Sequence, residues 1–205
     1  GEYMSGCGGD HQFSGLDPTY KRALWWVMII NAVMFLVEIG AGVHAHSQAL
    51  LADALDFLAD ALAYSLALWA IGKHHRIRAK VALSKALTLL LMALWVFGSS
   101  LWQWWQVDVP KAQVMGAVAV AALLANLVSV RLLMVYKDGD ANVRSVWLCS
   151  RNDAIGNVVV MIAAGLVYWT QSSWPDLAAA MVMSGLFLYA AVTIFRQAWS
   201  ELEHP

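Results

Sequence analysis

The chain has 205 residues, of which 60% are hydrophobic and only 13% are charged, and its mean hydropathy is +0.60. A soluble domain usually carries about 25% charged residues, so this composition argues against a soluble protein and favours one that is surrounded by lipid. The formal net charge of −1 argues against a nucleic-acid partner, because no basic stripe is present to neutralise phosphates. The two cysteines, Cys7 and Cys149, are too isolated to indicate a disulfide framework.

Six apolar segments follow one another along the chain, each close to the roughly 20 residues that a membrane-spanning helix needs. They cover residues 23–43, 48–71, 82–105, 114–136, 146–169 and 177–195. Short polar connections separate them, and several tryptophans lie near the segment ends, where membrane interfaces favour aromatic rings. The sequence therefore predicts an all-α integral membrane protein with six transmembrane helices and without a cleavable signal peptide.

The positive charges predict which side of the membrane each connection faces. If both termini are cytoplasmic, the inner side receives eleven Lys and Arg residues and the outer side receives only Lys111, while Arg151 lies within the fifth segment. The eleven are Lys21, Arg22, Lys73, Arg76, Arg78, Lys80, Lys85, Arg131, Lys137, Arg144 and Arg196. We therefore expect cytoplasmic N- and C-termini.

The lengths of the two ends predict a single domain. Residues 1–20 are expected to form a flexible tail, in which residues 1–3 before Met4 are typical of a tag remnant. A six-helix transport domain is expected at residues 21–200, followed by a short tail at residues 201–205. No cytoplasmic C-terminal domain is expected.

Three aspartates interrupt the second apolar segment. Asp53, Asp56 and Asp60 are separated by three and four residues, which at about 100° per residue places them within roughly a 60° arc of one helix. Carboxylates inside a bilayer are costly, and such residues usually mark a path or a site for ions or protons. This stripe predicts that the chain handles a cation within the membrane.

The fifth segment supplies a second pair of polar side chains. Cys149 and Asp153 are one helical turn apart and share a face, as does Asn157 one turn further on. At a rise of 1.5 Å per residue, Asp60 and Asp153 each lie about 15–20 Å into a core of about 30 Å, measured from opposite sides. We expect the two pairs to meet near the middle of the membrane. Asn31, Glu38 and Asn126 are expected to add a polar lining from the first and fourth segments.

Four side chains at i and i+4 on two helices can build a tetrahedral metal site. The predicted ligands are Asp56, Asp60, Cys149 and Asp153. Three carboxylates and a thiolate suit Zn²⁺, and the sulfur also suits softer ions such as Cd²⁺. Protons and metal compete for such ligands, which is the physical basis of an exchanger.

The motifs that carry these residues resemble those of the cation diffusion facilitator family. HSQALLADALDFLADAL and NVRSVWLCSRNDAIGN are similar to its second and fifth helices, and VMIINAVMFLVEI is similar to its first. The resemblance covers roughly residues 21–200. It implies a homodimeric exporter of divalent transition metals, usually Zn²⁺, that works in the cell (inner) membrane by proton antiport and alternating access. Such a protein is a transporter, not an enzyme, and needs no cofactor.

Two departures from the family pattern affect what the resemblance implies. Most members have histidine where this chain has Cys149, which favours a softer cation. Most members also have a cytoplasmic metal-binding domain after the sixth helix, which is not expected here. The homodimer would then depend on contacts between membrane helices, with small residues such as Gly98, Ser99 and Ser184 serving either that contact or packing within one chain.

Several residues have two interpretations that the sequence leaves open. Asp53 is either a ligand or part of the pathway, and Cys149 is either a ligand or a small packing residue. The histidine pairs His44/His46 and His74/His75 are either solvated or weak secondary sites, as are Cys7 and His11 in the tail. Arg151 must face a carboxylate, a polar pathway or the inner interface, and Glu38 is more typical of a hydrogen-bonding residue than of a ligand.

Two other functions are compatible with acidic membrane helices. A Mg²⁺-dependent membrane diphosphate transferase would need a second carboxylate cluster or several basic residues that grip phosphates, and only Arg151 is near. A proton-coupled organic-cation exporter would need an aromatic cavity around the carboxylates, whereas the neighbours of Asp56 and Asp60 are mostly Leu and Ala. Metal export is the function that the pattern favours.

Overall fold

The structure is a computed structural model that describes residues 18–70, 75–106, 108–134 and 141–203. Within these ranges the side chains at several helix ends, including residues 75–82 and 141–152, are not described. The described chain forms six helices: α1 (Pro18–Ala45), α2 (Gln48–Ala70), α3 (His75–Gln106), α4 (Ala112–Met134), α5 (Ala141–Thr170) and α6 (Trp174–Glu203). The predicted all-α architecture is confirmed.

Five of the six helices contain a stretch that is long and apolar enough to cross a membrane. These stretches are Lys21–Ala45, Leu83–Gln106, Ala112–Met134, Asp153–Thr170 and Trp174–Arg196. The remaining helix, α2, is 23 residues long and carries the three aspartates. Large apolar side chains are exposed on the outside of the bundle, and the tryptophans near helix ends are among the most exposed, with Trp169 at 84% and Trp105 at 82%. The chain is a multi-pass membrane protein.

Four helices extend well beyond the apolar segments predicted, and the first of them, α1, begins at Pro18 instead of residue 23. α3 begins at His75, whereas the predicted segment began at residue 82, and α5 begins at Ala141 instead of residue 146. α6 continues to Glu203, beyond the predicted end at residue 195. The added residues include Lys, Arg, Glu and Gln, which are good helix formers but are polar. Hydropathy locates the membrane-crossing part of a helix and misses its polar extensions.

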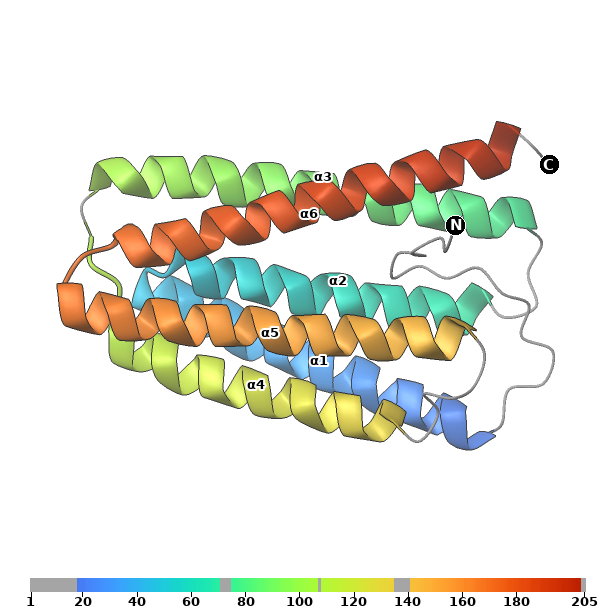
Figure 1. The fold of residues 1–205 in the computed structure, drawn as a ribbon, viewed down its shortest axis with the longest axis horizontal. Coiled ribbons are helices and arrows are strands. Elements are labelled where there is room, and N and C mark those ends of the chain that lie inside the picture. Colours follow the sequence, from blue (N-terminus) through green and yellow to red (C-terminus); the bar gives the residue numbers. More distant parts are fainter. Residues whose placement is uncertain (1–17, 71–74, 107, 135–140, 204–205) are drawn as a thin grey trace.

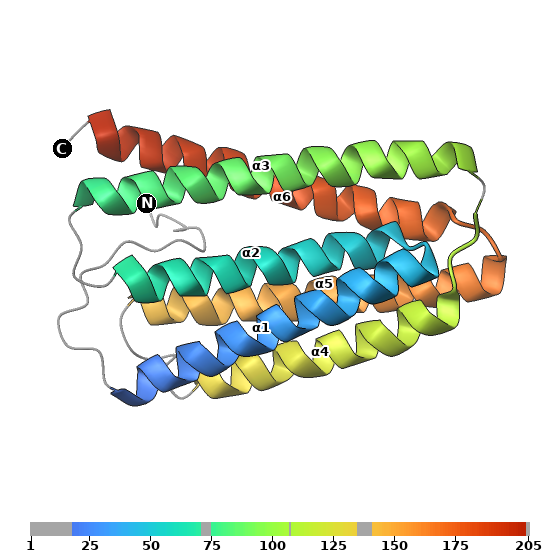
Figure 2. The same ribbon diagram turned by 180° about the vertical axis from the view of Figure 1, so that it is seen from behind.

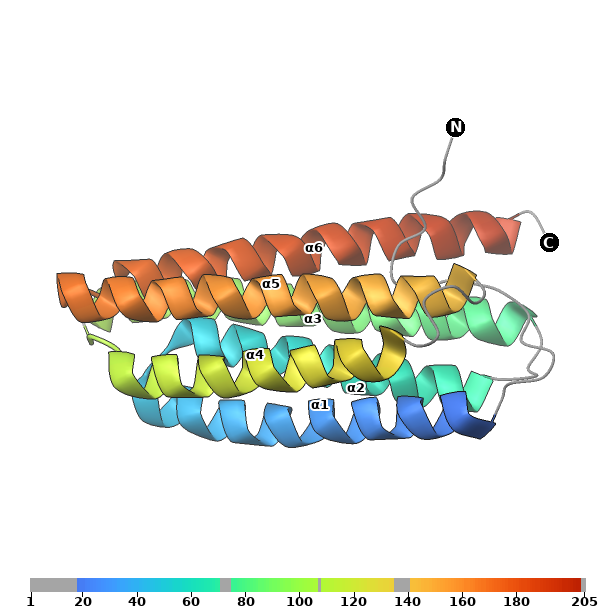
Figure 3. The ribbon, with the colours of Figure 1, turned by 60° about the horizontal axis from the view of Figure 1, so that its bottom comes forward.

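The helices divide into a group of four and a pair. In Figure 1, α1, α2, α4 and α5 lie together and α3 and α6 cross one another beside them; Figure 2 shows the same division from behind. α2 contacts α1, α3, α5 and α6, and α1 contacts α4 on its other side. Figure 3 shows α1 and α6 at opposite faces of the bundle. The aspartate-bearing helix therefore lies at the centre of the molecule.

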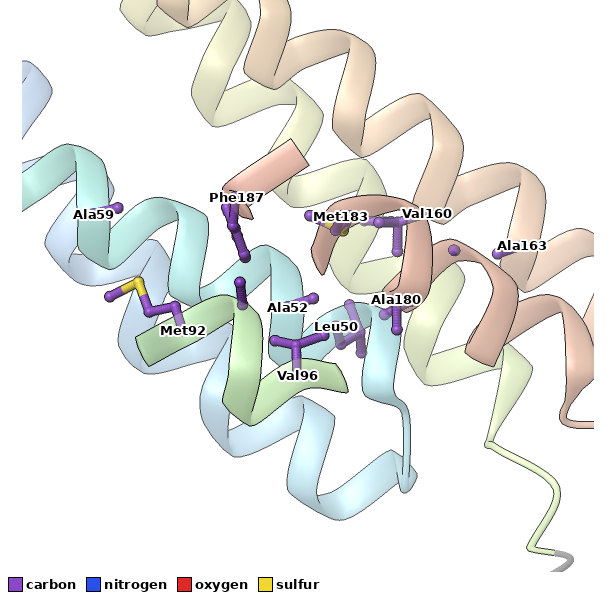
Figure 4. Packing of buried hydrophobic residues seen from close by; sticks show 14 of the residues in the cluster. Leu50, Ala52, Ala59, Met92, Val96, Val160, Ala163, Ala180, Met183 and Phe187 are labelled. Atoms are coloured by element: carbon purple, nitrogen blue, oxygen red, sulfur yellow. The ribbon is translucent and has the colours of Figure 1, made fainter. Parts of the chain in front are cut away.

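The core between α2, α3, α5 and α6 is built largely from small side chains. Figure 4 shows Leu50, Ala52 and Ala59 of α2 facing α3, α5 and α6 across this core. Without a hydrophobic force between helices in lipid, close backbone approach through small residues is the main source of packing energy. Ser184 of α6 adds a hydrogen bond to the carbonyl oxygen of Ala93 on α3 at 2.9 Å. Ser184 therefore serves packing within one chain.

The connection between α1 and α2 fixes the start of the central helix. His46 has a φ of 55°, and the Ser47 amide donates to the Gly42 carbonyl at 3.0 Å, which closes α1 with a left-handed residue and a six-to-one hydrogen bond. Gly42 is necessary because an added Cβ would lie 2.8 Å from Leu51 Cδ2. The Ser47 hydroxyl then caps α2 by accepting from the Leu50 amide at 3.1 Å.

Asp176 of α6 joins this helix start to the α3–α6 pair. Its carboxylate accepts from the Ser47 hydroxyl at 2.6 Å, the Gln48 amide at 2.8 Å and the Ala49 amide at 3.1 Å. These donors belong to the N-terminus of α2, where a negative charge is also stabilised by the helix dipole. Asp176 can therefore be completely buried and ionised. The role of Asp176 could not be predicted from the sequence, because its three donors lie more than a hundred positions away.

Candidate metal site

The three aspartates of α2 do not share one environment. Asp53 is buried, with 2% of its surface exposed, whereas Asp56 and Asp60 are half-buried. All three lie on the part of α2 that faces other helices. Lys85 of α3 is close enough to act electrostatically on Asp56 and Asp60. From the sequence, Lys85 was expected only on the inner side, because spacing along the chain does not reveal that α3 packs against α2.

Asp60 and Asp153 meet across α2 and α5, as the sequence predicted. Their carboxyl groups lie within hydrogen-bonding distance of one another, and Asp56 acts electrostatically on Asp153. Tyr64, one turn along α2, donates its hydroxyl to Asp60 Oδ2 at 3.2 Å. Oδ2 of Asp153 is buried and receives no hydrogen bond from the described residues. A proton or a metal cation would supply what these oxygens lack.

The complete four-ligand shell remains a prediction. Cys149 lies on α5 one turn before Asp153, but its side chain falls outside the described residues, as does that of Arg151. Among the described side chains, no three of His, Cys, Asp or Glu are gathered closely enough to hold a metal ion. The structure thus brings Asp60 and Asp153 together with Asp56 nearby.

A second cluster of polar side chains links four helices, one turn after Asp153 on α5 and two turns before Asp60 on α2. In the amide orientation of Asn157 that satisfies its neighbours, Nδ2 donates to Asp53 Oδ2 at 2.6 Å and to Oδ1 at 3.1 Å. Its Oδ1 accepts from Asn126 Nδ2 at 2.7 Å. Glu38 is completely buried against Asp53. The predicted polar lining from α1, α2, α4 and α5 is therefore present, although Asn31 bonds its own helix through the Val27 carbonyl.

The two histidines whose side chains are described lie away from these groups. His44 and His46 are exposed in the α1–α2 connection, and His44 Nε2 lies 3.2 Å from Lys111 Nζ. His74 falls outside the described residues, and His75 begins α3 with an undescribed side chain. Cys7 and His11 also lie outside the described part of the chain. The described histidines give no support to a secondary metal site.

The fold and the buried carboxylates define a multi-pass helical membrane protein with an acidic site shared between two central helices. The family model described as the cation efflux transmembrane domain matches residues 24–202. The chain belongs to this family of cation efflux proteins, the cation diffusion facilitators.

Curated relatives extend this comparison. The chain is 29% identical over 205 residues to the zinc transporter ZitB of Pectobacterium atrosepticum, covering 94% of this chain and 64% of the relative. It is 29% identical over 195 residues to the metal cation efflux system protein CzcD of Cupriavidus metallidurans, covering 89% and 60%. A cadmium, cobalt and zinc/H(+)-K(+) antiporter of Bacillus velezensis is 23% identical over 192 residues, with coverage of 87% and 61%. The chain thus spans less than two thirds of the length of these relatives.

Proposed function

We propose that this chain exports divalent transition-metal cations from the cytoplasm across the cell (inner) membrane by proton antiport with alternating access. Zn²⁺ is the foremost substrate, and Cd²⁺ or a related soft ion is the next. The observation that carries the proposal is the meeting of Asp60 and Asp153, from two central helices, with an Asp153 oxygen that has no described donor. The names of the similar proteins, which refer to zinc, cadmium and cobalt, support the same substrate class.

The proposed ligands are Asp56, Asp60, Cys149 and Asp153. Two carboxyl groups in contact, as Asp60 and Asp153 are, share a proton when no metal is present. A divalent cation replaces that proton and neutralises both carboxylates, so metal binding and proton binding exclude one another. Lys85 offsets part of the negative charge on Asp56 and Asp60.

The division of the bundle supports alternating access. Asp60 and Asp153 belong to the four-helix group, and the α3–α6 pair lies beside it. Movement between the two groups would expose the acidic site to one side of the membrane at a time. We further propose that the protein works as a homodimer in the lipid bilayer, formed through its membrane helices, and that it needs no cofactor.

Metal binding to the purified protein and to its Cys149→Ser variant tests the ligand set. Titration calorimetry with Cd²⁺, Zn²⁺ and Mn²⁺ should give an affinity loss for Cd²⁺ of about tenfold or more, because sulfur is a soft ligand, and little change for Mn²⁺. Equal affinities of wild type and variant for all three ions would remove Cys149 from the shell. The site would then be assigned to the carboxylates, with Asp53 or Asn157 as the remaining candidates.

The other two functions have less support. A diphosphate transferase would require basic side chains around the acidic pair, and among the described residues only Lys85 acts on Asp56 and Asp60. An organic-cation exporter would require aromatic walls, and Tyr64 is the aromatic residue that contacts Asp60. Strict Mg²⁺ dependence without Zn²⁺ or Cd²⁺ binding would favour the enzyme, and protection of cells against quaternary ammonium ions but not metals would favour the organic-cation exporter.

A further inference from the structure

A second pair of carboxyl groups, Glu38 of α1 and Asp53 of α2, is buried beside the proposed metal ligands. Glu38 has no exposed surface and Asp53 has 2%. Their carboxyl groups are within hydrogen-bonding distance of one another. Neither residue belongs to the proposed ligand set, so metal binding at that set does not account for them. Two ionised carboxylates in contact, away from water, would repel each other strongly.

Hydrogen-bond donors are distributed unequally between the two members of this pair. Both oxygens of Asp53 accept from the Asn157 side-chain amide, whose own oxygen is held by Asn126. Neither oxygen of Glu38 receives an N–H or O–H bond from the described residues. A carboxylate with amide donors tolerates burial, whereas one without donors does not. The surroundings therefore favour a negative charge on Asp53 and a proton on Glu38.

The charged groups that face Glu38 favour the same assignment. α1 packs against α2 and α4. From α2, Asp53 and Asp56 both act on Glu38 with negative charge. On α4, the polar residue of this layer is the neutral Asn126, and the cationic Arg131 is exposed near the helix end. No described cation is arranged to stabilise an ionised Glu38.

We infer that Glu38 carries a proton and donates it in a hydrogen bond to ionised Asp53, so that this pair is a proton-binding site separate from the metal ligands. The pair shares α2 with the metal site and is connected to α5, the other helix of that site, through Asn157. Asp53 lies three residues before Asp56 on α2, and Asn157, the donor to Asp53, lies one turn after Asp153 on α5. A change in the spacing of α2 and α5 therefore acts on both sites.

Because Glu38 lies close to the metal site, its proton can take part in the exchange of protons for metal. This role rests on the proposed metal transport. A divalent cation at Asp56 cancels the negative charge that Asp56 exerts on Glu38 and adds positive charge nearby. Both effects favour release of the Glu38 proton when metal binds. Proton uptake by Glu38 would, by the same linkage, favour metal release.

Infrared spectroscopy of the lipid-reconstituted protein without metal tests the proton directly. A protonated carboxyl group has a carbonyl stretching band that is separate from carboxylate bands and shifts in D₂O. The difference between wild type and Glu38→Gln at neutral pH should contain one such band. Asp53→Asn should keep this band but shift its frequency, because an amide oxygen replaces the carboxylate as acceptor. The matched control is Asp176→Asn, which replaces a buried carboxylate that has three donors and should leave the band in place.

Three outcomes would overturn the assignment. One is a Glu38→Gln difference spectrum without a carboxylic acid band, which would mean that Glu38 is ionised. Another is an Asp53→Asn spectrum with an unshifted band, which would mean that the two groups do not share the proton. The third is loss of the same band in Asp176→Asn. Circular dichroism and gel filtration of each variant establish that the bundle is intact before spectra are compared.

Proton release on addition of Cd²⁺ in weak buffer tests the link to metal. Wild type should release about one proton more per bound metal than Glu38→Gln does. Equal release by both proteins would show that the Glu38 proton stays in place and would overturn the role in exchange. A wild-type protein that binds no metal would contradict the proposed function instead, and the infrared result on Glu38 would still stand.

Discussion

Aspartate side chains have opposite roles in two buried acidic regions of this bundle. At the α1–α2 connection, Asp176 has three hydrogen-bond donors and joins α6 to the start of α2. Near the middle of α2 and α5, Asp153 faces Asp60 and has an oxygen without a described donor. The first carboxylate is satisfied by the protein and stabilises the fold. The second is left for a proton or a metal, at a cost in stability that a structural role would not explain.

Replacing Asp153 with asparagine should give the largest functional effect. Loss of a carboxylate ligand should lower Zn²⁺ and Cd²⁺ affinity by at least about 100-fold, or about 2.7 kcal/mol. The thermal unfolding temperature should stay equal or rise, because the change removes a buried charge that lacks donors. Calorimetry and thermal unfolding in the same detergent measure the two effects. Wild-type metal affinity in Asp153→Asn would place the site elsewhere.

The same substitution at Asp176 should act on stability instead. Asparagine keeps only one acceptor oxygen, so its NH2 group would face the backbone amide of either Gln48 or Ala49 and leave that amide without an acceptor, and the free energy of unfolding should fall by about 2–3 kcal/mol. The comparison of Asp176→Asn with Asp153→Asn holds the chemistry of the change constant and varies only the surroundings. Equal unfolding temperatures for the two variants would contradict the distinction between a carboxylate that stabilises the fold and one that binds a proton or a metal.

A change at Gly42 tests how tightly the α1–α2 connection is built. Gly42→Ala adds a Cβ that would lie 2.8 Å from Leu51 Cδ2 and 3.2 Å from the Leu51 amide nitrogen, and the overpacking should cost about 1–3 kcal/mol. Gly40, two residues earlier on α1, has nothing within 4 Å of an added Cβ and provides the matched control. Gly40→Ala should be neutral or slightly stabilising in the same unfolding assay. If Gly40→Ala destabilised the protein as much as Gly42→Ala does, the loss at Gly42 could not be attributed to overpacking against Leu51.

Tyr64→Phe should give the smallest effect. It removes one hydroxyl donor, 3.2 Å from Asp60 Oδ2, and leaves the carboxylates in place. Loss of a neutral donor to a carboxylate costs about 0.5–1.5 kcal/mol, so metal affinity should fall by no more than about tenfold. The calorimetric titration used for Asp153→Asn measures this change in metal affinity. A loss of affinity as large as that of Asp153→Asn would mean that the Tyr64 hydroxyl is essential for positioning Asp60.

The helical class, the approximate membrane segments and the pairing of Asp60 with Asp153 could be predicted from the sequence. These follow from hydropathy and from the helical repeat, which are local properties, together with depth in the membrane, which the helix rise fixes. The helix ends at His75 and Glu203 escaped prediction because polar helix formers continue a helix beyond its apolar part.

The partners of the buried polar groups depend on helix packing and could not be predicted from the sequence. Asp176 became a helix cap because α6 packs against the start of α2, and Lys85 reached the acidic site because α3 packs against the same helix. The pairing of Asp53 with Asn157 and Glu38 depends on the positions of α1, α4 and α5. The groups that surround a charged side chain depend on how the helices pack. The difference between a structural carboxylate and a functional one is therefore a property of packing.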